Sequence, residues 1–144
     1  LDMLEEMRAA CYLHRVSTRD SGVLPASKLI RMATIEGARC LKLDKELGSL
    51  EPGKKADMII IGLNKPHLTP LLSNSISNVV ELIVFSAWGE DVSTVIVDGK
   101  VLMKDRKVHT LDEEEVILEA NEAAADLMDL TIQKFEAERG KVGL

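Results

Sequence analysis

The sequence has few aromatic residues and no excess of basic charge. One Trp, one Tyr and two Phe make up 3% of its 144 residues, so a core must be built mainly from aliphatic side chains. The net charge is −6. Nucleic-acid binding depends on basic patches and stacking rings. An acidic chain with few rings is therefore a poor candidate for a nucleic-acid partner.

Cysteines and long apolar runs are also scarce. Cys11 and Cys40 both fall in helix-like sequence, and we expect reduced core thiols rather than a disulfide. No apolar run approaches the roughly 20 residues of a membrane helix, and the best, "NVVELIVFSAW", contains Glu81. We therefore expect no membrane partner and a cytoplasmic location. Because helix-like sequence begins at Leu1 without a Met, we also expect a piece of a longer protein.

Two helices are predicted in the first 43 residues. The second begins at Pro25, where a missing N–H costs nothing, and runs to about Leu43. Gly37 within it indicates close packing against a neighbour, because a glycine inside a helix otherwise costs about 1 kcal/mol. The first helix has an apolar face at helical spacing, made of Leu4, Met7, Cys11 and His14.

The middle of the chain has strand and turn signals. The continuous apolar run at 57–61, "DMIII", predicts a strand buried on both faces. The segment "ISNVVELIVFSAW" fits a helix or a strand, and Ser77 as a cap favours the helix. Asp98-Gly99 predicts a hairpin with a type I′ turn, since both central residues need positive φ. Asp105-Arg106 predicts a second turn.

A long C-terminal helix is predicted from about Thr110 to Arg139. Thr110 and Glu113 have the spacing of a capping box. We expect the helix to cover the sheet or the other helices. Its predicted apolar stripe consists of Val116, Ala120, Ala123, Leu127 and Leu130.

Four motifs recur in an order that is specific when they are taken together. They are "AT.EGAR.L", "GSLEPGKKAD", "KPH..P" and "V..VIVDGKV". Through them, about residues 1–116 resemble the C-terminal region of the amidohydrolase superfamily, in its branch of adenosine-type and chlorohydrolase-type deaminases. The resemblance implies an α+β fold. Residues 1–43 would be the last helices of a (β/α)8 barrel, and residues 44–144 part of the flanking β-sandwich with an inserted helix and a C-terminal helix.

The resemblance also implies chemistry for the whole protein. It would be a metal-dependent hydrolase of carbon–nitrogen bonds other than peptide bonds, with a small-molecule substrate such as a purine nucleoside or another cyclic amidine. A divalent metal, zinc or iron, would activate water, held by a His-x-His pair, later histidines and an Asp. This chain has no His-x-His, and Asp2 matches a helix-start position that follows the family's ligand Asp. We therefore assign no catalytic, substrate-binding or metal residue and no cofactor to this chain, and expect it to be inactive alone.

Other polar residues have structural interpretations. His14 is interpreted as a packing residue and His109 as a surface residue, whereas His67 lies in a loop for which a substrate-side or subunit-contact role stays open. Lys54 and Lys55 are expected at a solvated rim. The six methionines are expected to fill the core.

The resemblance implies that the sandwich also contains strands from the N-terminal end of the gene, which this chain lacks. The strands that remain here would then have unpaired edges. We therefore expect a homodimer or a larger assembly. The alternative function is a noncatalytic assembly or regulatory domain that binds a partner through its strands and terminal helix.

Overall fold

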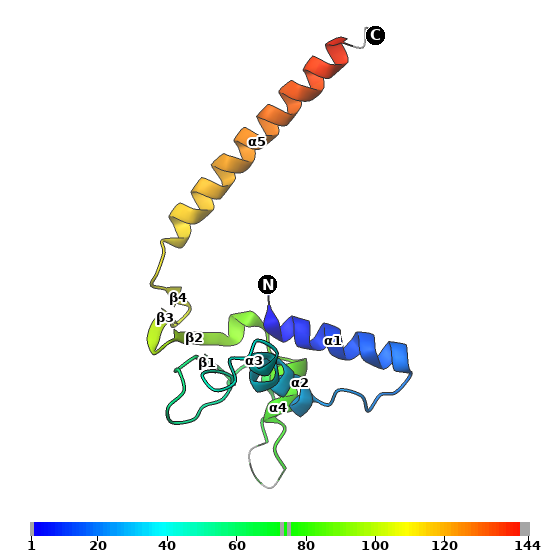
Figure 1. The fold of residues 1–144 in the computed structure, drawn as a ribbon, viewed down its shortest axis with the longest axis vertical. Helices are drawn as coiled ribbons and strands as arrows, with labels where there is room; N and C mark the ends of the chain where they lie inside the picture. Colours follow the sequence, from blue (N-terminus) through cyan, green and yellow to red (C-terminus); the bar gives the residue numbers. More distant parts are fainter. Residues whose placement is uncertain (1, 73, 75, 142–144) are drawn as a thin grey trace. The chain divides into compact units, whose positions relative to one another are not determined.

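The computed structural model describes residues 2–72, 74 and 76–141. The chain divides into two units, residues 1–107 and 108–144. Helices and a small antiparallel sheet form the first unit, and one long helix dominates the second (Figure 1). The predicted α+β class is thus confirmed. The elements are α1 (Met3–Thr18), α2 (Ala26–Arg31), η1 (Met32–Glu36), α3 (Gly37–Cys40), β1 (Met58–Ile61), η2 (Pro66–Leu68), α4 (Val79–Phe85), η3 (Gly89–Asp91), β2 (Val92–Val97), β3 (Lys100–Lys104), β4 (Lys107–Val108) and α5 (Glu113–Lys141).

Helix α1 buries one side, as predicted, but the buried stripe does not include His14. Leu4, Met7 and Cys11 are buried, whereas His14 is exposed. The covered side continues instead through Arg15, which is partly buried. At 3.6 residues per turn, a residue eleven positions after Leu4 comes back into line with it. His14 therefore does not belong to the face that Leu4, Met7 and Cys11 form, and whether it packs against a barrel stays a prediction.

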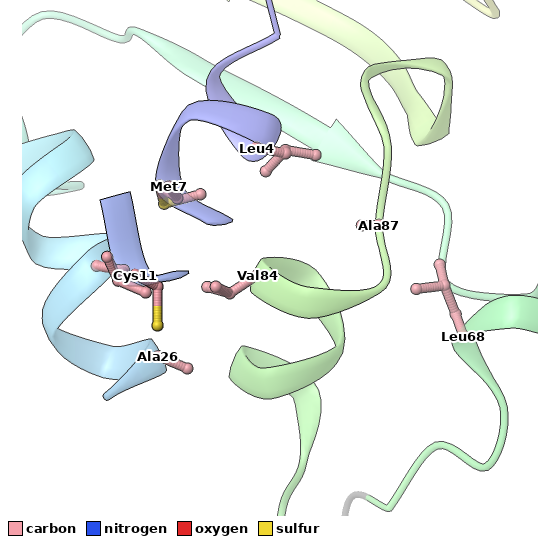
Figure 2. Packing of buried hydrophobic residues seen from close by; sticks show 8 residues of the cluster. Leu4, Met7, Cys11, Ala26, Leu68, Val84 and Ala87 are labelled. Atoms are coloured by element: carbon pink, nitrogen blue, oxygen red, sulfur yellow. The ribbon is translucent and has the colours of Figure 1, made fainter. Parts of the chain in front are cut away.

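The core of the first unit lies where α1, α2 and α4 meet. Figure 2 shows Met7 and Cys11 of α1 close to Ala26 of α2 and Val84 of α4. Cys11 and Val84 have no exposed surface, and Leu29 of α2 is also fully buried. Close packing of aliphatic side chains from three helices thus stabilises this unit.

Two expectations about the core are wrong in part. Cys11 is buried as predicted, but Cys40 is exposed, and both thiols are free. Met7 is a core residue, whereas Met3, Met32 and Met128 are exposed. Cys40 lies in the last turn of its helix, and apolar composition alone does not say which side of an element is covered.

The segments α2, η1 and α3 follow one another without a break, so residues 26–40 form one helical stretch. Its central five residues have π-helical hydrogen bonding. A Cβ atom at Gly37 would lie 2.9 Å from the carbonyl oxygen of Met32, which explains why a residue without a side chain stands there. The stretch ends at Cys40, three residues before the predicted end at Leu43.

Four antiparallel strands form the sheet, in the order β1-β2-β3-β4. Asp98 and Gly99 join β2 to β3 with φ values of 50° and 75°, so the predicted type I′ turn is confirmed. A second turn, also with positive φ at both residues, stands at Asp105-Arg106 as predicted.

Strand β1 is not buried on both faces. Ile59 and Ile60 are 52% and 53% exposed, so that prediction is wrong. Within the described residues β1 pairs with β2 alone and forms an edge of the sheet. A continuous apolar run predicts that both faces of the strand are covered by neighbours. In the described part of the chain, the two faces of β1 are not both covered.

The ambiguous segment after Ser77 is a helix, as favoured. Helix α4 starts after Asn78, and Ser77 contributes only a 3.5 Å contact from its Oγ to the backbone N–H of Val79. Val84, which faces the core, is buried.

In the second unit, α5 begins later than predicted. The Asp112 carboxylate accepts hydrogen bonds from the N–H groups of Glu114 and Glu115, at 3.0 and 3.3 Å. Asp112 is therefore the N-cap, and the predicted capping box at Thr110 is wrong because the helix starts at Glu113, too late for Thr110 to reach its first turn. What α5 packs against stays a prediction. None of the helices in the described ranges is long and apolar enough to span a membrane.

Candidate functional site

Arg8 is a buried cation at the junction of α1 and α4. It lies on the covered side of α1 and is 6% exposed. Its Nη1 donates to the carbonyl oxygens of Ala87 and Val84, at 2.6 and 3.4 Å. These carbonyls lie at and just beyond the C-terminal end of α4, where a cation is favourable. The guanidinium also stacks on Trp88, with its central carbon 4.3 Å from the ring centroid.

Asp2 connects the start of α1 to the same region. One carboxylate oxygen accepts from the N–H of Leu4 at 2.8 Å and caps α1, and the other accepts from the N–H of Gly89 at 2.8 Å. Burial raises the pKa of Asp2, but the N–H donors of Gly89, Leu4 and Glu5 and the charge of Arg8 outweigh it, so this pKa is lowered. Asp2 therefore stays ionised and fixes where the chain enters α1.

Asp91 is the second buried charge, and its side chain has no exposed surface. His67 Nε2 lies 2.9 Å from Oδ2, which also accepts from the N–H of Trp88 at 2.8 Å. Lys65 Nζ lies 2.5 Å from Oδ1 and forms an ion pair with it. Asp91 thereby joins the loop at 65–67 to η3.

The pKa of Asp91 reflects this environment. Burial raises the pKa, but the contacts with Lys65 and His67 and the N–H of Trp88 outweigh burial and lower it to about 2. A buried carboxylate is stable only when it is compensated in this way.

We name this set the brace: Asp2, Arg8, His67, Trp88 and Asp91. The brace joins α1, the end of α4, η2 and η3 through side-chain contacts. Sequence reasoning missed Arg8 and Asp91. The signal for Arg8 was its position, four residues after Leu4 and three before Cys11, on the apolar side of a helix. No comparable signal marks Asp91.

The histidines and thiols do not gather in one place. His14 and His109 are exposed, and His67 is engaged with Asp91. Within residues 2–72, 74 and 76–141, no three His, Cys, Asp or Glu side chains are grouped so that they could hold a metal ion. A hydrolytic zinc site takes about three protein ligands, and His67 Nε2 and both Asp91 oxygens are already in use. The described residues thus do not fit a hydrolytic metal centre.

The two lysines expected at a rim differ from each other. Lys55 is half exposed and pairs with Glu46 at 3.0 Å. Lys54 is only 12% exposed. Its ammonium donates to the carbonyl oxygen of Asp44 and to Ser49 Oγ, both at 2.6 Å. The solvated-rim interpretation is therefore wrong for Lys54, which holds the loop before β1 together.

Part of this loop lines an open, mostly apolar groove of about 600 Å³. The other lining residues come from the segment 33–41 and from β1 and β2. Ile59, half exposed, lines the groove. An apolar groove of this kind is suited to packing against another piece of protein.

Comparison with solved structures shows that this fold is similar to part of a zinc-bearing deaminase. An adenosine deaminase from Xanthomonas campestris with bound zinc superimposes with a TM-score of 0.81 at 27% sequence identity. The match covers 88% of this chain and 28% of that one.

Comparison of the sequence with protein families identifies the family of this chain. Residues 1–102 match the model of the amidohydrolase family, and the chain belongs to that family. A 5-methylthioadenosine/S-adenosylhomocysteine deaminase of Syntrophomonas wolfei subsp. wolfei is 48% identical over 131 residues, and a 5'-deoxyadenosine deaminase of Methanosarcina mazei is 48% identical over 128. Each match covers 89% of this chain and 28% of the relative. The chain thus spans just over a quarter of the length of these relatives.

Proposed function

We propose that this chain is the C-terminal part of an amidohydrolase that deaminates adenosine-type nucleosides, and that it supplies scaffold rather than metal ligands. The observation that carries the proposal is the 48% identity to two deaminases across almost nine-tenths of the chain. The zinc in the solved relative supports a divalent metal in the whole protein.

The exposed face of α1 supports the barrel part of this proposal. Tyr12, Leu13 and Val16 are 52%, 71% and 78% exposed, although the opposite side of the helix is buried. A helix that is apolar on both sides is normally covered on both. In the proposed whole protein this second face packs against barrel strands.

The groove and the free edge of β1 support the sandwich part in the same way. Both would be covered by strands from elsewhere in the protein, which would also bury Ile59 and Ile60. Edge strands are normally paired or protected.

The brace has a specific role in this proposal. The family resemblance puts the ligand Asp shortly before α1, and Asp2 binds Gly89 at the point where the chain enters that helix. The brace would therefore hold the metal-ligating segment in place from behind, as residues that orient metal ligands do in other enzymes.

The test compares two proteins: this 144-residue chain and the product of the complete reading frame that contains it. Each is supplied with zinc and assayed for ammonia release from 5'-methylthioadenosine, S-adenosylhomocysteine and 5'-deoxyadenosine. We expect ammonia from the complete product and none from the chain. Turnover by the chain alone would refute the scaffold role, and no turnover by the complete product would refute the deaminase assignment.

A noncatalytic assembly module is the second candidate, favoured by the exposed apolar side chains of α5. The coding sequence before Leu1 separates the two. A His-x-His motif about three hundred residues upstream and an Asp just before Leu1 would support the deaminase, and a start codon near Leu1 would support the module.

A further inference from the structure

The long helix α5 has an acidic stripe and an apolar stripe beside it, and further large apolar residues, Ile117, Leu118, Met128, Ile132 and Phe135, lie outside that apolar stripe. The acidic stripe advances by four and three residues in turn. The apolar stripe has the same spacing, which is that of a coiled-coil seam. The acidic stripe consists of Glu115, Glu119, Glu122, Asp126 and Asp129, and the apolar stripe, which we call the seam, of Val116, Ala120, Ala123, Leu127 and Leu130.

The seam is exposed to solvent. Val116, Leu127 and Leu130 are 47%, 64% and 55% exposed. Most of the stability of a helix in a protein comes from packing of its apolar face rather than from intrinsic propensity. A stable α5 therefore needs a surface that covers the seam.

We propose that the seam binds the seam of a second copy of this chain, with the two α5 helices antiparallel. This inference does not depend on the proposed deaminase activity. If the two-fold axis passes between the helices at the level of position 125, a residue that follows position 125 by a given number meets the residue of the second copy that precedes it by the same number. Leu127 then faces Ala123 of the second copy, and Leu130 faces Ala120. Large side chains thus pack against small ones throughout the centre of the pair.

Charge favours the antiparallel direction. The first turn of α5 has three acidic residues, Glu113, Glu114 and Glu115, and the basic Lys134 lies near the other end of its described side chains. In the antiparallel pair, Lys134 of one helix meets Val116 of the other, next to the acidic residues Glu114 and Glu115. A parallel pair would bring six carboxylates together and align the two helix dipoles.

The area that the pair would bury is at the lower end of what a specific dimer needs. Val116, Leu127 and Leu130, with Ile117 and Met128 on their flank, would each bury about 60–120 Å². Two helices together would bury about 600–1,200 Å², close to the roughly 1,000 Å² expected of a specific interface. A lipid surface fits the helix poorly, because helices that bind membranes have basic rather than acidic polar faces.

The first test measures the mass of the full 144-residue chain by sedimentation equilibrium between about 1 and 100 µM. Leu127→Glu is compared with Leu118→Glu, which places the same charge on the same helix on the side away from the seam, where Leu118 is 59% exposed. We expect dimers for the unaltered chain and for Leu118→Glu, and at least about a tenfold weaker dimer for Leu127→Glu. Far-ultraviolet circular dichroism checks that both variants keep their helix.

The second test fixes the direction by cross-linking. In a Cys40→Ser background, which removes the exposed native thiol, Ala124→Cys and Leu130→Cys are each treated with a bis-maleimide that spans about 8 Å. In the antiparallel pair the two copies of position 124 lie about 3 Å apart along the axis and the two copies of position 130 about 15 Å apart, so only Ala124→Cys should cross-link. Equal cross-linking of both would overturn the direction. A monomer at every concentration, or a dimer unaffected by Leu127→Glu, would overturn the pairing itself.

Discussion

At the scale of single residues, the first unit depends on two buried charges, each held by several polar partners although one atom of each, Arg8 Nη2 and Asp91 Oδ1, has no hydrogen-bond partner. Arg8 binds the carbonyls at the end of α4, and Asp91 is held by Lys65 and His67. Removing one partner of such a contact leaves a buried group without compensation, which costs more than the contact itself contributes. We therefore expect the brace to be sensitive to substitution.

Asp91→Asn tests this expectation and gives it a pH dependence. The folded pKa of about 2 is below the ordinary value, so the ionised carboxylate contributes stability that is present above about pH 4 and is lost as the pH falls towards 2. The shift corresponds to about 2 kcal/mol of pH-dependent stability. In urea unfolding, the variant should be less stable than the unaltered chain by at least about that amount near pH 6, and the difference should shrink by about that amount near pH 2.5. An equal difference at both pH values would contradict this account of Asp91.

Gly48 and Gly53 form a matched pair for a test of close packing. Both have positive φ, at 90° and 93°. A Cβ at Gly48 would lie 2.8 Å from Ile35 Cα, whereas a Cβ at Gly53 would meet nothing within 4 Å. Gly53→Ala should cost about 1–2 kcal/mol of unfolding free energy from backbone strain, and Gly48→Ala at least about 1 kcal/mol more from the clash. Equal losses in urea unfolding would show that the loop can move away from the helix.

The sequence indicates some of these residues better than others. Asp98-Gly99 could be predicted because a type I′ turn demands residue types that accept positive φ. His67 could be placed in a loop, but its partner Asp91 is 24 residues away. Local patterns say nothing about which distant polar groups meet, so the brace could not be predicted as a set.

At the scale of elements, hydrogen-bonding caps decide where helices begin. Asp112→Ala removes the side chain that accepts from Glu114 and Glu115. The loss should be about 0.5–2 kcal/mol of helix stability, measured as lower helicity or a lower melting temperature by circular dichroism. Thr110→Ala is the control, and it should change neither. If Thr110→Ala had the larger effect, the helix would begin as the sequence alone suggested.

Whether a segment forms a helix or a strand was easier to predict than which of its side chains are buried. The helical spacing in α1 and the hairpin of β2 and β3 were predicted because local periodicity determines them. The run in β1 was correctly read as a strand, but its burial depends on neighbours outside the local sequence. The same holds for Cys40 and the exposed methionines.

At the scale of the whole molecule, the chain has surfaces that are typical of part of a larger assembly. The second face of α1, the groove beside β1 and the seam of α5 are all apolar and exposed. We proposed that the remainder of an amidohydrolase covers the first two and that a second copy covers the third. The family could be predicted from the order of four motifs, whereas the substrate could not, because residues outside this chain would choose it.

Zinc titration of the 144-residue chain, followed by calorimetry and by metal analysis after dialysis, tests the central claim most directly. The account predicts no stoichiometric zinc, because the described residues supply a single His–carboxylate contact whose atoms are already engaged. One tightly held zinc per folded chain, lost on substitution of His67 or Asp91, would contradict it.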